Sequence, residues 1–189
     1  MFKDYIVIDD VFEDPHSIAY RAKKMDYYFA PNCENIIGKY KHLNFIEKDK
    51  SDLSWLGFRT DSIHLIDKKF FEFLLNSIFD KVFEKYKLNY EYTARAHFGI
   101  MPNGMKYEDG WLHQDNGFYA GVVYLNEVPT KDSGTIIQID NKKNVVENKF
   151  NRMVLYNAKL HHAPQNSFVG DVDDRLILAF AIGRLQVTI

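Results

Sequence analysis

The sequence contains a single cysteine and five scattered prolines, and it has no long apolar run. Cys33 cannot form an intramolecular disulfide, so a secreted disulfide framework is excluded. The aliphatic run at residues 176–182 is far shorter than the roughly 20 residues that cross a bilayer. Residues 1–5 lack the apolar stretch of a signal peptide. We therefore expect a soluble, cytoplasmic protein with no membrane as partner.

The sequence also lacks an excess of one charge. It has 24 Lys and Arg against 26 Asp and Glu, which gives a net charge of −2, and no long run of one sign occurs. Proteins that neutralise many phosphates usually carry a basic excess or stripe. Nucleic acid is therefore disfavoured as the main partner.

Aromatic residues are abundant, with 15 Phe, 12 Tyr and 2 Trp among 189 residues. This length is typical of one domain, and so much large apolar surface can fill a core and still line a ligand cavity. The many aromatics of the N-terminal half could pack on the protein's own sheet or on a second subunit, so a homo-oligomer stays open.

The first 90 residues favour helices after a short strand at residues 5–8. Asp14 can cap a helix and Pro15 suits its first position, which predicts a helix from here to about Met25. Asp67 can cap a second helix, whose apolar face follows from residues spaced three and four apart: Phe71, Leu74, Leu75, Ile78, Val82 and Tyr86. Residues 30–60 have an irregular pattern.

After residue 90 the pattern changes to short β segments separated by turn signals. The predicted strands are residues 90–101, 118–126, 135–139, 153–156 and 175–182. Strands without intervening helices favour an antiparallel sandwich or jelly roll, and helices followed by strands make an α+β protein. We predict a single domain over residues 1–189, with 1–90 as mainly helical support and 91–189 as the β core.

His113 and Asp115 form an H-x-D pattern in the segment WLHQDNG. Side chains two apart on a strand point to the same side, so both can reach one metal. With a second His, they would form the facial triad of non-heme Fe(II) oxygenases. The pattern alone is weak, because chance gives it about 0.6 times in this composition; the competing interpretation is a surface histidine near a loop.

Later features strengthen the metal interpretation. His161 and His162 follow the apolar strand at 153–156, and a jelly roll can return such a strand beside the first pair. Arg175 opens the last apolar strand on its less bulky face. A buried arginine is costly unless an anion pairs with it, which favours a carboxylate ligand. Tyr124 and Asn126 could add hydroxyl and amide contacts.

Four ordered blocks resemble the Fe(II)/2-oxoglutarate-dependent dioxygenases, and within them the prolyl-4-hydroxylase-like branch. The resemblance covers roughly residues 95–183. The blocks are HQDNG at 113–117, GVVYLN at 121–126, SGTII at 133–137, and the distal His followed by RLIL at 175–178.

The resemblance implies a double-stranded β-helix with a bound iron. Its metal ligands would be His113, Asp115 and one of the paired histidines, and His162 is favoured over His161. The family's basic residue, which pairs with the far carboxylate of 2-oxoglutarate, falls on Arg175. Its tyrosine falls on Tyr124 with Asn126 close by, and an aliphatic site residue falls on Ile137.

The implied activity is an oxygenase that uses Fe(II), 2-oxoglutarate and O2 to hydroxylate a C–H bond of an amino acid, a peptide or protein residue, or a small metabolite. Two alternatives stay open. One is a cupin-like metal enzyme that does not use 2-oxoglutarate, and the other is a non-catalytic jelly roll that binds a ligand.

Three further segments have two interpretations each. Arg95 could face the cavity or make a surface ion pair, and the second is favoured. His97 is interpreted as a hydrogen-bonded structural histidine. Residues 55–60 (WLGFRT) could form part of an entrance lid or an ordered loop.

Overall fold

The structure is a computed structural model that describes residues 4–29, 33, 37–46, 57–83, 89–102, 112–129, 131–165 and 174–188. Its helical elements are α1 (Pro15–Lys23), η2 (Ile37–Lys39), α2 (Ile63–Ile66) and α3 (Lys68–Phe83). Its strands are β1 (Tyr5–Ile8), β2 (Asp26–Phe29), β3 (Asn44–Phe45), β4 (Phe58–Arg59), β5 (Asn89–Met101), β6 (Tyr119–Tyr124), β7 (Thr135–Ile139), β8 (Lys142–Val146), β9 (Met153–Asn157), β10 (His161–Pro164) and β11 (Arg175–Thr188).

The strands form two sheets. The major sheet has eight strands in the order β1-β9-β6-β11-β5-β4-β2-β3, and the minor sheet has three in the order β10-β7-β8. Strand β11 lies between β5 and β6 and is antiparallel to both, although these strands are far from it in sequence. This crossover pattern belongs to a jelly roll, so the predicted double-stranded β-helix within an α+β protein is confirmed.

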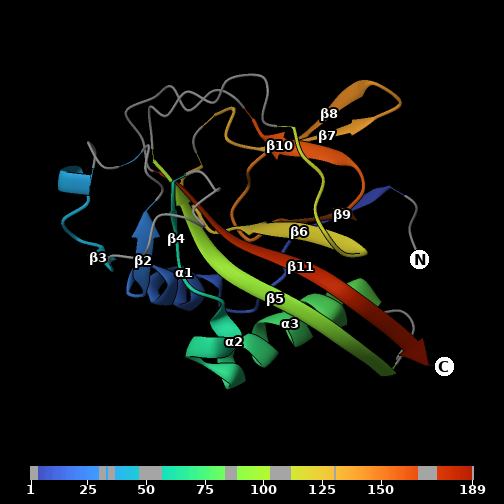
Figure 1. The fold of residues 1–189 in the computed structure, drawn as a ribbon, viewed down its shortest axis with the longest axis horizontal. Coiled ribbons are helices and arrows are strands. Elements are labelled where there is room, and N and C mark those ends of the chain that lie inside the picture. The colour runs from blue at the N-terminus through green and yellow to red at the C-terminus, as the bar shows by residue number, and fades with distance from the viewer. Residues whose placement is uncertain are drawn as a thin grey trace.

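The major sheet has a different partner on each face. Helices α2 and α3 lie on one side of β5 and β11, whereas β7, β8 and β10 lie on the other (Figure 1). On the helical side, residues of α1 and α3 share one apolar core with even-numbered residues of β11. On the other side, Ile137 and Val146 of the minor sheet pack with Val122 and Ile177 in a second, smaller core.

The two longer helices begin where the sequence predicts. The Asp14 carboxylate accepts a hydrogen bond from the Ser17 N–H at 3.1 Å, with Pro15 in the first turn. Asp67 accepts the Phe70 N–H at 2.9 Å, and this bond is the first cause that lowers the pKa of its carboxyl. Helix α1 ends at Lys23, slightly before the predicted Met25. Among the described residues, no helix is long and apolar enough to span a membrane.

The N-terminal part contributes more strand than the sequence predicts. Strands β2, β3 and β4 lie within residues 26–59, and they extend the major sheet beyond β5. Each has only two to four residues, too short to show a period. The description of residues 1–90 as mainly helical support is therefore incomplete, because this part also supplies one edge of the sheet.

Two strands of the minor sheet are also absent from the prediction. Strand β8 begins with two lysines and pairs with β7 across a two-residue turn. Asp140 and Asn141 in this turn both have positive φ, at 48° and 62°, as a type I′ hairpin requires. Strand β10 contains the paired histidines and a proline, a composition that does not suggest a strand.

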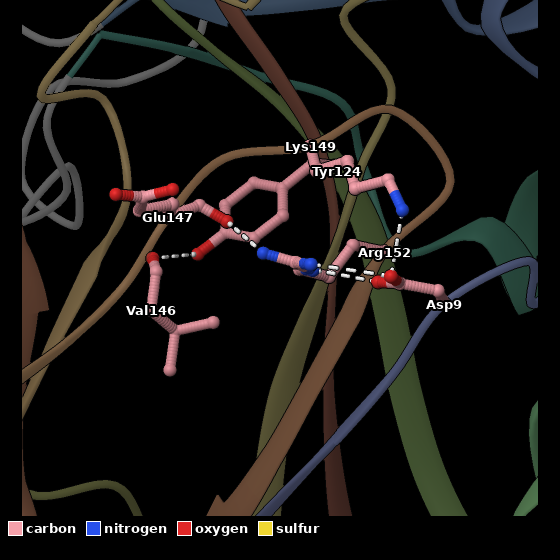
Figure 2. Close-up of polar contacts among 6 residues, drawn as sticks. All are labelled: Asp9, Tyr124, Val146, Glu147, Lys149 and Arg152. Carbon is pink, nitrogen blue, oxygen red and sulfur yellow. Dashed lines mark hydrogen bonds and ion pairs between the residues drawn. The ribbon is translucent and has the colours of Figure 1, made fainter.

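A cluster of charged residues ties the N-terminal segment to the β core (Figure 2). The Asp9 carboxylate contacts Arg152 Nε at 2.6 Å and Lys149 Nζ at 2.7 Å. Hydrogen bonds from these two cations lower the pKa of Asp9 to about 2. Figure 2 also shows the Tyr124 hydroxyl donating to the Val146 carbonyl, at 3.2 Å, which holds the end of β8 against β6.

Candidate metal centre and its cavity

His113, Asp115 and His162 converge on one point. One ligand atom from each side chain lies within 4.8 Å of the others. His162 Nε2 is 3.4 Å from one Asp115 oxygen, and His113 Nε2 is 3.9 Å from the other. The neighbouring His161 is exposed on the other side of β10, so the structure brings His162 to the pair.

Backbone pairing produces this convergence. His113 and His162 form an antiparallel bridge, in which the His113 N–H donates to the His162 carbonyl at 3.1 Å and the reverse bond measures 2.9 Å. The Asp115 N–H donates to the Ala158 carbonyl at 2.9 Å. The H-x-D segment is therefore held between the ends of β9 and β10, and both of its ligands face the same way.

A glycine completes the turn after the H-x-D segment. Gly117 has a φ of 118°, in the region that favours glycine, and a Cβ there would lie 2.7 Å from the Ile182 carbonyl oxygen. The next residue, Phe118, donates its N–H to that same oxygen at 2.9 Å. Gly117 thus lets the metal-binding segment pass directly onto β6 beside β11.

The tautomer of His162 fits a cation. Its Nδ1 lies 3.0 Å from the Leu160 carbonyl, an acceptor only, so Nδ1 carries the proton. In the neutral imidazole Nε2 then presents a lone pair toward the Asp115 carboxylate. Either a proton or a metal cation between Nε2 and the Asp115 oxygen would satisfy both groups, and a backbone carbonyl behind a metal-ligating histidine is the usual support.

The electrostatics of Asp115 agree with this arrangement. Burial acts to raise the pKa of its carboxyl, but the contact with His162 and the charges of both imidazoles and Arg95 lower it below its ordinary value. The carboxylate is therefore ionised and available as an oxygen ligand. Two imidazole nitrogens and one carboxylate oxygen are the donor set of the 2-His-1-carboxylate sites that bind Fe(II).

A cavity of about 200 Å³ joins this cluster to Arg175. Arg175 is only 3% exposed. Its Nε donates to the Ser133 carbonyl at 2.7 Å, and its Nη2 donates to Thr135 Oγ1 at 3.0 Å. Its Nη1 lies 3.0 Å from Met101 Sδ. Among the described residues, no carboxylate lies within ion-pair distance of this buried guanidinium, so its charge is available to an anion in the cavity.

Comparison with solved structures finds the same architecture elsewhere. A Pseudomonas putida prolyl-4-hydroxylase aligns over 95% of this chain and 92% of its own, with a TM-score of 0.51 and 15% identity. A Trichoplax adhaerens prolyl hydroxylase, in complex with a hypoxia inducible factor oxygen degradation domain peptide fragment, aligns over 95% and 83%, with a TM-score of 0.54 and 12% identity. The chain has the prolyl 4-hydroxylase fold. No family model matches the sequence, and no curated protein sequence matches it.

Within this prolyl 4-hydroxylase fold, three predicted site residues lie behind the cavity wall. Tyr124, Asn126 and Ile137 are buried, and none of them is among the described residues that line the cavity. The Tyr124 hydroxyl bonds Thr135 Oγ1 at 2.7 Å, and its ring lies 5.4 Å from the Arg175 guanidinium carbon. In the structure these residues support the residues that line the cavity, and direct contacts with a ligand stay a prediction.

Asn126 holds the start of β11. Its side-chain amide donates to the Asp174 carbonyl, and its Oδ1 accepts the Leu176 N–H at 2.9 Å. These bonds hold the backbone on both sides of Arg175. Asn126 thus supports Arg175 through the backbone. Ile137, fully buried in the smaller core, fills the space between the two sheets.

Tyr156 is a cavity residue that the sequence argument missed. It lies on β9, its ring centroid is 4.4 Å from that of His162, and it lines the cavity. Its hydroxyl makes no hydrogen bond to any described residue. After burial, which has the largest effect, the charge of Asp115 raises the pKa of this hydroxyl, and the charge of Arg175 lowers it. Burial raises the pKa of this phenol well above its ordinary value, so its hydroxyl is neutral and can donate a hydrogen bond in the cavity.

Arg59, His97 and Arg95 also line this cavity. Residues 55 and 56 of the predicted lid or loop lie outside the described residues, whereas Phe58 and Arg59 form β4, which pairs with β5. Arg95 lines the cavity, which the other interpretation expected, and it makes no ion pair with any residue that the structure describes, so the surface ion pair stays a prediction. His97 contacts Arg59 and is hydrogen-bonded, as predicted.

Proposed function

We propose that this protein is an Fe(II)- and 2-oxoglutarate-dependent oxygenase that hydroxylates a C–H bond. One observation carries the proposal: a two-histidine, one-carboxylate cluster and a buried arginine without a carboxylate partner among the described residues line the same small cavity. The fold shared with prolyl hydroxylases supports it.

His113, Asp115 and His162 would hold the iron. Bound iron with 2-oxoglutarate and O2 would supply oxidative decarboxylation of the keto acid, which gives succinate and CO2 and places one oxygen atom on the substrate carbon. With only three protein ligands, a bound iron would also be able to take the cosubstrate and O2. The protein's own contribution is to fix the ligand atoms through the backbone bridge between His113 and His162.

Arg175 would bind the distal carboxylate of 2-oxoglutarate. Its contacts to Ser133, Thr135 and Met101 leave N–H groups on both terminal nitrogens for a bidentate pair with a carboxylate. Tyr124 holds Thr135, and Asn126 holds the backbone on each side of Arg175. This support fixes the distance between the anion site and the metal ligands, so a dicarboxylate of one length is selected.

The walls of the cavity would exclude water from the reaction. Ile177 and Pro164 supply apolar surface beside the polar groups, and His162 is 4% exposed. Charge interactions in such a site are stronger than in water. The substrate is an amino acid, a peptide or protein residue, or a small metabolite; a peptide is the ligand in the Trichoplax adhaerens complex.

An anaerobic titration tests the proposal. Fe(II) followed by 2-oxoglutarate should give a weak visible charge-transfer band from the chelated keto acid, and the band should be lost in His113→Ala. His161→Ala is the matched control, because that exposed side chain points away from the cluster and the band should remain. Metal binding without any band would favour a metal enzyme that does not use 2-oxoglutarate. Absence of metal binding would favour a non-catalytic ligand-binding protein.

A further inference from the structure

Tyr156 is a buried tyrosine whose hydroxyl group has no hydrogen-bond partner among the described residues. The residue is 3% exposed, and buried polar groups in proteins are nearly always hydrogen-bonded. The buried tyrosines Tyr27, Tyr40 and Tyr124 follow that rule, because their hydroxyls donate to other residues of the protein at 3.0, 2.6 and 2.7 Å. The Tyr156 hydroxyl is therefore available to a ligand.

This hydroxyl opens into the cavity that its own ring lines. Among the described residues, Asn148 Oδ1 is a completely enclosed side-chain atom without a partner, and the Tyr156 oxygen is not such an atom. It therefore has access to the cavity of about 200 Å³ beside it. The neighbouring positions on the sheet are small, since Tyr156 is paired in register with Ala120 and Ala120 with Ala181. A ligand in the cavity can reach the hydroxyl.

The Tyr156 ring packs against the metal cluster. Its centroid lies 4.4 Å from the centroid of His162, at an angle of 45° between the planes. After burial, the charge of Asp115 has the largest effect on the pKa of the phenol, and the opposing effect of Arg175 is smaller. Charge effects weaken with distance, which agrees with a hydroxyl closer to the metal ligands than to the guanidinium.

A phenol supplies at this place what a phenylalanine would not. Either ring would pack against His162, but only tyrosine adds an O–H donor. The proposed cosubstrate presents two different ends to the cavity: its 2-oxo acid end at the metal ligands and its distal carboxylate at Arg175. The oxygen atoms of both ends accept hydrogen bonds, and an ionised acceptor strengthens them. The position of the ring beside His162 favours the 2-oxo acid end.

We propose that the Tyr156 hydroxyl donates a hydrogen bond to the 2-oxo acid end of 2-oxoglutarate, beside the metal. This assignment rests on the proposed oxygenase function and divides the recognition of the cosubstrate between two residues. Arg175 selects for a distal carboxylate, whereas Tyr156 binds the part that all 2-oxo acids share. Tyr156 is thus a binding residue for the cosubstrate, supplied by β9.

The test compares two acids that share the metal-binding end. 2-Oxoglutarate carries the distal carboxylate, and 2-oxopentanoate has a methyl group in its place. Each is titrated without oxygen into the Fe(II)-loaded protein, unmodified and as Tyr156→Phe. The affinity and the wavelength of the visible charge-transfer band are recorded. Binding of Fe(II) alone is measured separately by calorimetry.

Tyr156→Phe should weaken the binding of both acids by the same factor, roughly threefold. The band should also move to a shorter wavelength, because loss of a hydrogen bond to the chelated acid raises the energy of its acceptor orbital. Arg175→Met should behave differently: it should weaken 2-oxoglutarate roughly 10- to 100-fold and leave 2-oxopentanoate nearly unchanged. If 2-oxopentanoate gives no band, the wavelength shift with 2-oxoglutarate decides.

Stability separates a ligand contact from a structural one. Tyr156→Phe should not lower the unfolding temperature of the metal-free protein, because its hydroxyl has no bond to a described residue to lose. Tyr27→Phe is the matched control, since that hydroxyl donates to the Ala22 carbonyl at 3.0 Å in the helical core. Tyr27 is not among the described residues that line the cavity. Its variant should unfold at a lower temperature and bind both acids unchanged.

Three results would overturn the assignment. The first is an unchanged affinity and band position in Tyr156→Phe, which would mean that the hydroxyl bonds water and not the cosubstrate. The second is a loss confined to 2-oxoglutarate, which would place the contact at the distal carboxylate. The third is a parallel loss of Fe(II) affinity, which would show that Tyr156 acts only by packing on His162. Absence of the band in the unmodified protein is recorded first, and it would overturn the proposed function together with this assignment.

Discussion

The two faces of the major sheet are built from the same strands but have different roles: one packs in the helical core and the other lines the cavity. On β11, Leu176, Leu178, Phe180 and Ile182 pack into the helical core, and Leu178 and Ile182 are completely buried. The alternating residues Arg175, Ile177, Ala179 and Ala181 face the cavity. One face is filled by large side chains and the other is kept partly empty. A strand's period of two allows adjacent residues to serve stability and binding separately.

The strongest test of this comparison substitutes adjacent residues of β11. Leu178→Ala should lower the free energy of unfolding by about 2–5 kcal/mol, because it leaves a void in the helical core. Ala179→Leu should cost much less stability, since the new side chain enters the cavity, but it should obstruct ligand binding. Urea denaturation measures the first effect and 2-oxoglutarate titration the second. Equal loss of stability in both variants would mean that the cavity face is packed as tightly as the helical face.

A second test removes the charge of the cavity face and keeps its packing. Arg175→Met should weaken 2-oxoglutarate binding roughly 10- to 100-fold, because charge-assisted hydrogen bonds to the distal carboxylate are lost. Metal affinity should remain, since Arg175 is not among the three clustered ligands. Calorimetric titrations with the metal alone and with 2-oxoglutarate separate the two. Parallel loss of both affinities would show that the variant disturbs the strand rather than the anion site.

A smaller effect is expected at Tyr156. Tyr156→Phe keeps the ring against His162 and removes a hydroxyl that faces the cavity, so the affinity for 2-oxoglutarate should fall roughly threefold. Tyr124→Phe is the comparison variant. The Tyr124 hydroxyl bonds Thr135 and the Val146 carbonyl, so its removal should lower the stability of the fold rather than the affinity for 2-oxoglutarate. A larger binding loss in Tyr124→Phe than in Tyr156→Phe would reverse these roles.

The smallest effect concerns Asp9, in the partly exposed charge cluster of Figure 2. Its folded-state pKa, about 2, lies below the ordinary value of 3.8, so its ion pairs stabilise the fold above about pH 4 and are lost as the pH falls toward 2. The carboxylate is partly exposed, so Asp9→Asn should cost less than about 1 kcal/mol at pH 7. Thermal unfolding from pH 6 to pH 2 should show the difference between the two proteins shrinking. If the difference in unfolding temperature did not change with pH, the effect of Asp9→Asn would come from packing rather than from the ion pairs.

The sequence predicted the elements whose signals are local or strongly periodic. The capped starts of α1 and α3, the alternation along β11 and the H-x-D segment all follow from neighbouring residues. Predicting the distal histidine required the order of the four sequence blocks as well as their residue types. The choice of His162 over His161 agrees with burial, since adjacent residues of β10 face opposite sides.

The remaining features depend on tertiary contacts that no local pattern contains. Arg59 enters the cavity because the two-residue strand β4 pairs with β5, and a two-residue strand has no period to recognise. Tyr124 and Tyr156 lie in strands of similar composition, so only the packing shows which hydroxyl faces the cavity. The pair Asp140-Asn141 was a readable hairpin signal for β8.

Strand β11 has a consequence for how the protein is made. It runs from residue 175 to residue 188 and inserts between β5 and β6, which are synthesised long before it. Until it leaves the ribosome, the nascent chain carries two unpaired strand edges and two incomplete apolar layers. Folding to the native state must therefore follow synthesis of this segment.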